Sequence, residues 1–485
     1  MEKRILKIID NRRVELLAVS LILLGCFAVR LYKINNPIAD WHSWRQVDTA
    51  AVTNIYLDEG LDLLHPRYYD ISSVQTGFDN PEGLRFVEFP VFNLFHYFFV
   101  KAFPFISFDA LGRSVSILSA VVTTFFLFKI GKKLMGKWVG LSAAFFYAFI
   151  PFNVYFTRVI LPDPLTVTLS ISSLWFFLVY YESNKKFPIF VSAFLFGIGM
   201  IAKPQALFFG LPIAVLMLQK HSFKKIIQSV PLVFSLFLAF MPFILWRYWI
   251  TQPENIRGIA HISWVFNGDN IRFKPAFWRW IFGERIGTLI LGVWGVIPFG
   301  FGLLNLKKKD LFLVCLTLGM FLYLSIIATA NVRHDYYQTY IVPAIALLLG
   351  YGSIQLWNYK AFNKWGRRLT VVFSVFMIFI MGYDQIKGFY NINHPEIVTA
   401  GKAVDQLAER DAKIVAPYNG DTAFLYETKR FGWPIITTNI DDLIERGADY
   451  YVSVNNDDDT NKFKQRFEII VENDQYIILD LHKEI

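Results

Sequence analysis

The chain has 485 residues, of which 54% are hydrophobic and 18% are charged, and its mean hydropathy is +0.39. One water-soluble core cannot bury so much apolar surface, so most of the chain is expected to lie in a lipid bilayer. The net charge of +9 and the presence of only two cysteines exclude few functions by themselves. The positions of the basic residues and of the cysteines exclude more. The Lys and Arg residues cluster between apolar stretches, which argues against nucleic-acid binding, and each cysteine lies inside an apolar stretch, which argues against a disulfide framework.

The first apolar run, residues 15–32, follows the basic N-terminal sequence MEKRILKIIDNRR. No small-residue cleavage site follows the run, so it is predicted to remain as a signal-anchor helix. A membrane-spanning helix needs roughly 20 mainly apolar residues. By this criterion the other predicted membrane helices lie at residues 110–130, 138–155, 164–182, 188–203, 204–219, 228–248, 286–304, 311–329, 338–357 and 370–387.

The loops between these helices alternate in charge when the N-terminus is placed in the cytoplasm. Every loop on the inner side is then basic, as the positive-inside rule requires. These inner loops are KIGKK (129–133), ESNKKF (182–187), KHSFKK (220–225), NLKKKD (305–310) and NYKAFNKWGRR (358–368). The sequence therefore predicts a polytopic α-helical protein of a bacterial inner membrane with about eleven transmembrane helices, and its outer segments are 33–109, 155–163, 249–285, 330–337 and the residues after 388.

The C-terminal tail has a different texture from the rest of the chain. Strand-like runs (IVAPY, PIITT, YYVSV and EIIVENDQYIILDL) alternate with helix-like runs (TAFLYETKRF and DDLIERGA). This alternation is typical of a compact α/β unit. Two domains are expected: a transmembrane module over residues 1–388, which includes a long loop at 33–109, and a small extracytoplasmic α/β domain over residues 389–485.

The long loop begins with an unusual density of polar and aromatic residues. It reads Asp40-Trp41-His42-Ser43-Trp44-Arg45-Gln46-Val47-Asp48 shortly after the first membrane helix. Tryptophans at the membrane interface, with Asp40 capping the next helix, would produce the same composition without any function. The run alone therefore leaves a structural and a functional interpretation open.

Three more clusters of ionisable residues lie at the same predicted membrane face. They are Glu88-Phe89-Pro90, the turn FTRVILPDP with Arg158 and Asp163, and Arg333-His334-Asp335-Tyr336-Tyr337. Ionisable groups at helix ends are costly unless they are paired or used, so these clusters favour a polar site at the outer membrane boundary. Snorkelling side chains and interhelical salt bridges are the alternative interpretation.

A carboxylate near arginine and histidine suits one kind of group transfer in particular. The carboxylate can take a proton from an acceptor hydroxyl while the cations hold a leaving phosphate. Neither a Walker A sequence nor GxGxxG occurs, so a nucleotide donor is not indicated. The expected donor is a sugar on a lipid phosphate that arrives through the membrane.

Together these motifs resemble those of bacterial membrane glycosyltransferases of the GT-C fold. The resemblance is to family 39 or 83 types, such as the protein O-mannosyltransferases and the lipid A aminoarabinose transferase. It spans about residues 10–390. The motifs that carry it are D-x-H-x-W-R-Q-x-D-T-A, E-x-P, R-x-x-x-x-D-P and H-D-Y-Y. It implies a polyprenyl-phosphate-linked sugar as donor, with a lipid, glycan or protein of the cell envelope, lipopolysaccharide included, as acceptor. A flippase or transporter for the same lipid and a non-catalytic scaffold for envelope assembly are the alternatives, but a transporter is expected to show internal repeats, and the sequence shows none.

In this family an aspartate of the first outer loop activates the acceptor. Here it corresponds to Asp40 or Asp48, because this chain has Arg45-Gln46 where relatives have Asp-Glu. Asp40 is preferred since its place in a loop lets it approach an acceptor, whereas Asp48 would pair with Arg45 at i,i+3 once a helix has begun. The remaining donor-phosphate and substrate contacts implied by the resemblance are His42, Trp44, Arg45, Gln46, Glu88, Arg158, Asp163, Arg333, His334, Tyr336 and Tyr337.

The E-x-P element departs from the family in its middle residue. Phe89 replaces the lysine that contacts the donor phosphate in relatives, so Arg45, Arg158 or Arg333 is expected to supply that positive charge. Glu88 and His334 together offer a carboxylate and an imidazole, which suit a divalent metal such as zinc or manganese. A lone histidine beside tyrosines is more often a hydrogen-bond donor, which is the alternative interpretation of His334.

Overall fold

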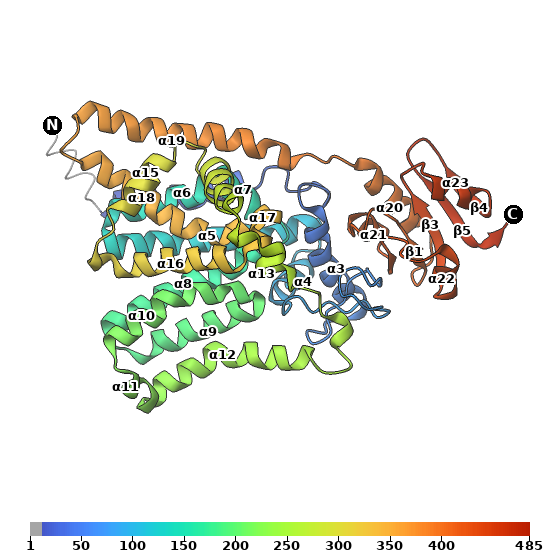
Figure 1. Ribbon diagram of the computed structural model, residues 1–485, viewed down its shortest axis with the longest axis horizontal. Coiled ribbons are helices and arrows are strands. Elements are labelled where there is room, and N and C mark those ends of the chain that lie inside the picture. Colours follow the sequence, from blue (N-terminus) through green and yellow to red (C-terminus); the bar gives the residue numbers. More distant parts are fainter. Residues whose placement is uncertain (1–11) are drawn as a thin grey trace. The chain divides into compact units, whose positions relative to one another are not determined.

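The computed structural model describes residues 12–485 and is mostly helical, with one β-sheet near the C-terminus (Figure 1). The chain divides into two compact units. The helical unit comprises residues up to Ile34, Arg113–Leu245 and Ile262–Gly388. The mixed unit comprises Asn35–Gly112, Trp246–His261 and Phe389–Ile485, so it joins almost all of the long loop to the tail. The division predicted from the sequence, 1–388 and 389–485, shares with these units only the boundary after Gly388.

Every stretch predicted to span the membrane contains helix. The main helices are α2 (Arg12–Val29), α5 (Phe108–Met135), α6 (Lys137–Phe149), α7 (Pro151–Phe156), α8 (Asp163–Ser183), α9 (Lys186–Ala202), α10 (Gly210–Lys220), α12 (Val230–Ile250), α15 (Val296–Leu304), α16 (Leu311–Ile326), α18 (Val342–Asn358) and α19 (Lys364–Ile386). Five helical stretches among the described residues are long and apolar enough to cross a membrane. A multi-pass helical protein is thus confirmed, and the count of about eleven crossings stays a prediction.

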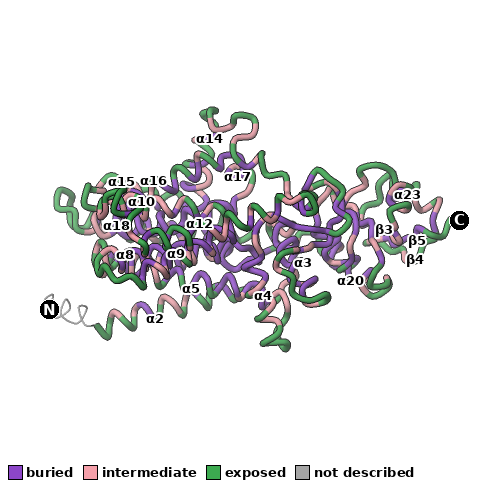
Figure 2. Tube along the Cα trace, turned by 90° about the horizontal axis from the view of Figure 1, so that it is seen from below, coloured by how far each residue is buried: buried purple, intermediate pink, exposed green. Residues whose placement is uncertain are grey.

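Several helices present apolar side chains outward. Only 22% of the apolar window in α12 is buried, against 72% in α8. Figure 2 likewise shows α2 as mostly exposed or intermediate, and its exposed residues include Leu17 and Leu24. In water such surfaces would be unfavourable, but in lipid they are the expected outer face of a bundle.

Shorter helical pieces fill the turns of the helical unit. Proline disfavours helix in the residue before it, so α9 ends before Lys203, which is extended, and the chain continues as η1 (Pro204–Phe209). The other pieces of this unit are α11 (Phe223–Gln228), α13 (Trp264–Asn267), η3 (Gly268–Phe273), α14 (Pro275–Arg279), η4 (Trp280–Ile290), η5 (Lys308–Asp310), α17 (Ala328–Arg333) and η6 (Asp335–Tyr340).

The sheet of the mixed unit has five strands in the order β2-β1-β3-β5-β4. The strands are β1 (Lys413–Val415), β2 (Gly432–Trp433), β3 (Ala448–Ser453), β4 (Phe467–Glu472) and β5 (Ile477–Glu484), and the helices are α3 (Ser43–Glu59), α4 (Val91–Ala102), α20 (Pro395–Leu407), α21 (Ala423–Thr428), α22 (Ile440–Glu445) and α23 (Asp458–Lys464). β1 runs parallel to β2 and β3, whereas β5 is antiparallel to β3 and β4. Its core includes Val415, Tyr451, Phe467 and Leu479.

The alternation predicted for the tail is confirmed, with one error. PIITT is not a strand. The strand at this place, β2, consists of the two residues just before it, Gly432 and Trp433. The long loop pairs with that strand, since Gly432 donates its N–H to the carbonyl of Tyr69 at 3.0 Å and accepts from Ile71 at 3.0 Å. Backbone pairing therefore ties the long loop to the outer edge of β2.

The approach of β1 to β2 requires glycine at position 432. A Cβ atom there would lie 1.8 Å from the carbonyl oxygen of Ile414. We expect Gly432→Ala to force the strands apart and to lower the free energy of unfolding by at least about 2 kcal/mol, read as a lower Tm and faster proteolysis of the tail. Gly388→Ala is the control, because a Cβ at Gly388 meets no atom within 4 Å. Equal Tm values for the two variants would contradict this account of the sheet.

Candidate functional site

The polar run of the long loop lies at the start of α3, which begins at Ser43. The residue before the helix is His42, with a left-handed φ of 56° and no capping hydrogen bond from its side chain. The residue at the N-cap position is therefore His42 and not Asp40, as the structural interpretation had assumed, while an interfacial role of the tryptophans stays a prediction. Arg45, Gln46 and Asp48 are all buried on the first turns of α3.

Four charged side chains of the mixed unit form a buried network, which we call the charge chain: Arg45, Glu88, Arg85 and Asp48. Arg45 Nη2 donates to Glu88 Oε1 at 2.6 Å, Arg85 Nη1 lies 3.7 Å from the same oxygen, and Arg85 Nη2 lies 3.2 Å from Asp48 Oδ2. Their exposed fractions are only 3%, 8%, 5% and 1% in that order. Charges so buried are tolerated when each faces the opposite sign, and the alternation here meets that condition, although Arg85 Nε makes no hydrogen bond to the described residues.

The predicted pairing of Arg45 with Asp48 is wrong. Asp48 instead accepts hydrogen bonds from three segments: Thr422 Oγ1 at 2.6 Å, Gln75 Nε2 at 3.1 Å and Arg85 Nη2 at 3.2 Å. The i,i+3 spacing on α3 was correct, but the guanidinium of Arg45 reaches Glu88 instead. Both oxygens of Asp48 are thus occupied, which favours a positioning role for this carboxylate.

Asp40 lies outside the charge chain but close to its first member. Gln46 donates to Asp40 Oδ1 at 2.7 Å and to the carbonyl of Trp41 at 3.1 Å. Asp40 is only 4% exposed, more buried than its loop position suggested, because Gln46 folds back over it from α3. Trp41 stacks on Phe389 with ring centroids 4.9 Å apart, so the tail also supports this end of the loop.

The other aromatic members of the motif also have contacts within this unit. His42 packs against the Trp41 ring at 5.1 Å, and the carbonyl of Trp44 accepts from Thr422 Oγ1 at 3.4 Å. Thr422 thus contacts α3 at two points. Thr422, Gln75 and Arg85 were missed from the sequence, since nothing in their local pattern marks them.

A further buried carboxylate of the long loop, Asp70, was also missed. It is 1% exposed, its Oδ1 accepts the N–H of Ser72 at 2.8 Å, and its Oδ2 has no hydrogen-bond partner among the described residues. Burial raises the pKa of Asp70 to about 7 against the opposing hydrogen bonds from Ser72, and the negative charge of Asp48 raises it further.

The helical unit holds the other predicted residues. Arg158 is fully buried between α7 and α8 and donates from Nη2 to the carbonyl of Lys33 at 2.8 Å. Asp163 begins α8 and is 1% exposed, and neither of its carboxylate oxygens accepts a hydrogen bond from the described residues. Its nearest cation is Lys203, with Nζ 3.9 Å from Oδ2.

Lys203 connects two of the predicted clusters. It is 4% exposed at the break after α9, and its Nζ lies 6.0 Å from the centroid of the Tyr337 ring. The turn of Asp163 and the loop of Tyr337 are therefore brought together around this lysine. The sequence contained a signal for it, since Lys203 is the one charged residue of an apolar stretch over 188–219, and such residues are usually paired or functional.

The side chains of residues 333–337 contact two different sets of neighbours. Tyr336 and Tyr337 stack on each other at 4.7 Å, on the side of Lys203, and His334 stacks on Tyr336 at 5.6 Å. Arg333 is exposed and lies 5.4 Å from the Trp264 ring, which His334 also contacts at its edge. Asp335 faces Arg285 at 3.6 Å. His334 thus has the tyrosine neighbours on which its interpretation as a hydrogen-bond donor rested, and that role stays a prediction.

The metal hypothesis rested on Glu88 and His334. Across residues 12–485 no group of three or more His, Cys, Asp or Glu side chains is close enough together to hold a metal ion. Glu88 Oε1 is already shared by two arginines. A divalent metal held by Glu88 and His334 stays a prediction.

Comparison with known proteins identifies the fold and finds a family match over part of the chain. Residues 88–249 match the family described as dolichyl-phosphate-mannose-protein mannosyltransferase. No curated protein matches the chain in sequence. The structure resembles ArnT from Cupriavidus metallidurans bound to undecaprenyl phosphate, with a TM-score of 0.66 and 11% identity over 96% of this chain and 97% of that chain.

A second solved structure has the same general fold. It is the oligosaccharyltransferase AglB from Archaeoglobus fulgidus, in complex with an inhibitory peptide and a dolichol-phosphate. Its TM-score is 0.57 at 10% identity, over 90% of this chain and 69% of that chain. These likenesses confirm the fold predicted from the sequence, and the family match over residues 88–249 agrees with the predicted class of enzyme, a membrane glycosyltransferase.

The buried Asp70 predicts how stability varies with pH. Because its pKa is higher in the folded chain than in the unfolded chain, the folded state binds the extra proton, and the free energy of unfolding should fall as pH rises from about 4 to about 7. Asp70→Asn should make the Tm less dependent on pH between 5 and 8. Some dependence will remain, since burial also raises the pKa of Asp421 to about 6 and of Glu427 to about 8.

Asp62→Asn is the matched control for this measurement. Partial burial raises the pKa of Asp62, but hydrogen bonds from His65 and Leu64 outweigh it and give a net decrease, so this carboxyl does not titrate in the same range. Tm values that vary with pH equally in Asp70→Asn and in the unmodified chain would show that Asp70 does not take up the proton.

Proposed function

We propose that the chain transfers a sugar from a polyprenyl-phosphate donor to a cell-envelope acceptor, because residues 88–249 match the family described as dolichyl-phosphate-mannose-protein mannosyltransferase. The relatives of known structure support such a donor, since ArnT is bound to undecaprenyl phosphate and AglB to a dolichol-phosphate. The reaction would take place on the extracytoplasmic side of a bacterial inner membrane, in keeping with the basic inner loops. The acceptor is a lipid, a glycan or a protein.

The observation that carries the proposal is the arrangement of Asp40 beside the buried charge chain. Asp40 and Arg45 lie on either side of the turn that starts α3, and Gln46 hydrogen-bonds Asp40 at 2.7 Å. A carboxylate held in this way is oriented before the acceptor arrives, which removes part of the entropic cost of reaction. The charge chain then acts as the fixed support of that turn.

In the proposed step the acceptor hydroxyl oxygen bonds to the anomeric carbon of the donor sugar. The bond between that carbon and the phosphate oxygen breaks, and the electron pair leaves with the polyprenyl phosphate. Asp40 takes the hydroxyl proton as general base. Asp48, whose two oxygens already accept three hydrogen bonds, holds Arg85 and through it Glu88 and Arg45.

The leaving phosphate needs positive charge. Arg45 in the mixed unit and Arg158 and Arg333 in the helical unit are the candidates from the sequence, and Lys203 is added to them from the structure. Lys203 is buried, and its ammonium group can make a charge-assisted hydrogen bond to a phosphate oxygen. Tyr336 and Tyr337 would line the same part of the helical unit.

Substitution of the two aspartates separates their roles. Asp40→Asn keeps the shape and should lower transfer by roughly 10² or more, the usual scale for loss of a general base, while Tm and binding of undecaprenyl phosphate stay near normal. Asp48→Asn should lower the Tm and have a smaller effect on transfer, because it leaves Arg85 buried without its full complement of charge. Transfer would be measured with purified protein and the polyprenyl-linked sugars and envelope extract of the source cells.

The reverse pattern would assign the base to Asp48. Full transfer by both variants would exclude both carboxylates as the base and make Glu88 and Asp163 the next residues to test. A large decrease in Tm in both variants would not identify the base, because both proteins would be partly unfolded. Asp48→Glu is therefore included, since it retains the negative charge but shifts the carboxylate by one methylene.

Lys203 is tested by binding rather than by turnover. Lys203→Met should weaken binding of undecaprenyl phosphate at least about 10-fold, as expected for loss of a charge-assisted hydrogen bond, and Lys203→Arg should retain most of the affinity. Lys387→Met is the control, because Lys387 is an exposed residue of the same unit and is paired with Asp384. Unchanged affinity in Lys203→Met would remove this lysine from the donor site.

A further inference from the structure

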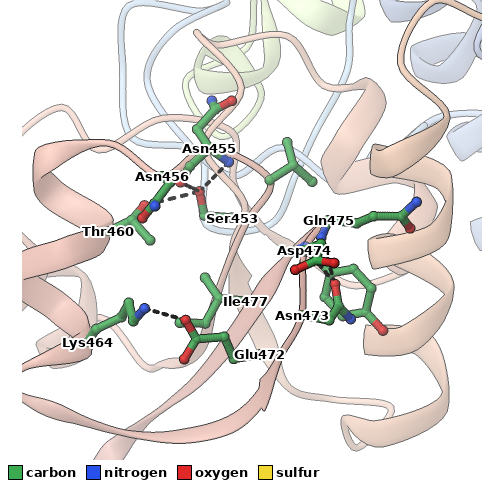
Figure 3. Close-up of a pocket in the computed structure, with 12 residues that line it drawn as sticks. Ser453, Asn455, Asn456, Thr460, Lys464, Glu472, Asn473, Asp474, Gln475 and Ile477 are labelled. Carbon is green, nitrogen blue, oxygen red and sulfur yellow. Dashed lines mark hydrogen bonds and ion pairs between the residues drawn. The ribbon is translucent and has the colours of Figure 1, made fainter.

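A hollow of about 360 Å³ lies at one end of the C-terminal sheet, within the mixed unit (Figure 3). One wall follows β3 and consists of residues 453–456, and the other is the turn between β4 and β5 at residues 472–477. Thr460 and Lys464 of α23 complete it. Its volume is within the range of small-ligand sites, and its lining is mostly amide and hydroxyl groups.

The wall after β3 is fixed by hydrogen bonds to a buried serine. Ser453 Oγ accepts the N–H of Asn455 at 3.0 Å and the hydroxyl of Thr460 at 3.1 Å, and Ser453 is 1% exposed. Thr460 Oγ1 is also 2.8 Å from the hydroxyl of Tyr451 in the sheet core. The backbone that carries Asn455 and Asn456 is therefore held in place before any ligand binds.

The opposite wall is fixed in a similar way by one asparagine. Asn473 Oδ1 accepts the N–H groups of Gln475 at 2.8 Å and Tyr476 at 3.0 Å, and the N–H of Asn473 donates to the carbonyl of Tyr476 at 3.1 Å. This turn holds Asp474 and Gln475 at the edge of the hollow (Figure 3). Preorganised walls lower the entropic cost of binding.

Several polar side chains at the rim of the hollow do not take part in the hydrogen bonds that stabilise the fold. Among the described residues, the side chains of Asn455, Asn456, Asp474 and Gln475 make no hydrogen bond to protein. Three of them are amides, and each amide offers two donor hydrogens and an acceptor oxygen. The half-buried Tyr476 adds an aromatic ring to the same lining.

The charge of the hollow narrows the chemistry of its ligand. Lys464 is ion-paired with Glu472, so Asp474 is the one uncompensated charge of the lining. A phosphate or another anion would meet a net negative charge, and a single unpaired carboxylate is too few for a metal site. Sugar hydroxyls, which both donate and accept, match the amides and the carboxylate without bringing charge.

We propose that this hollow binds a neutral oligosaccharide. If the proposed transferase function is correct, on which this second step rests, the oligosaccharide is part of the acceptor, and the acceptor is a glycan. Recognition would use the amides of Asn455, Asn456 and Gln475 for hydroxyl groups and the ring of Tyr476 for an apolar sugar face. The tail would then supply acceptor recognition to an enzyme whose proposed base lies in the long loop.

The test is binding of the full-length chain, in detergent, to an array of immobilised neutral and acidic envelope glycans. We expect binding to neutral glycans, and at least a 10-fold loss of it in the double variant Asn456→Ala, Gln475→Ala. Because these side chains make no hydrogen bond within the protein, the Tm of the variant should stay unchanged. Asn461→Ala is the matched control, since Asn461 is an exposed amide on α23 outside the lining.

Three results would overturn the proposal: no binding to any glycan, a preference for acidic glycans, or equal binding by the chain and the double variant. Binding of undecaprenyl phosphate and transfer of sugar are measured on the same preparations. Glycan binding without transfer would reject the proposed enzyme and keep the hollow as a saccharide site. Transfer that continues at full rate with no glycan binding would do the opposite.

Discussion

The mixed unit depends on the need to neutralise four buried charges. Arg45, Glu88, Arg85 and Asp48 are each less than a tenth exposed, and none could remain there unless its neighbours carried the opposite sign. Alternating signs along these contacts meet this need, and the arrangement forms only when the segment between α3 and α4, which carries Arg85 and Glu88, folds against α3. The position of the motif in the long loop follows from that requirement.

The same constraint draws the C-terminal tail into the unit. Asp48 has more hydrogen-bonding capacity than Arg85 fills, and Thr422 at the start of α21 and Gln75 supply the rest. Backbone pairing of Tyr69 and Ile71 with Gly432 attaches the loop a second time, at the edge of β2. The tail therefore helps to hold the loop that carries the proposed base, in addition to forming a sheet of its own.

Features that depend on composition were predictable from the sequence. Long apolar runs gave the helices, and alternating short runs gave the tail, because both signals are local. Partners far apart in sequence were not predictable: Arg85 and Thr422 have nothing in their neighbourhood that marks them as contacts of Asp48. The expected pair of Arg45 with Asp48 failed for this reason, since a distant glutamate competes with a neighbour on the same helix. Lys203 is an intermediate case, because a charge in an apolar stretch was visible but its partners were not.

The bond between Thr422 and Asp48 joins residues separated by 374 positions. Asp48 leaves the ribosome before almost all of the hydrophobic helices, whereas Thr422 is made after all of them. At 5–20 residues per second the delay is about 20–75 s. During that interval the remaining helices are inserted while the carboxylate of Asp48 stays hydrated. The carboxylate can be buried against Thr422 only after that part of the tail has been synthesised. A chain cut short before α21 would therefore retain every predicted membrane helix and still lack the bond that Thr422 makes to Asp48.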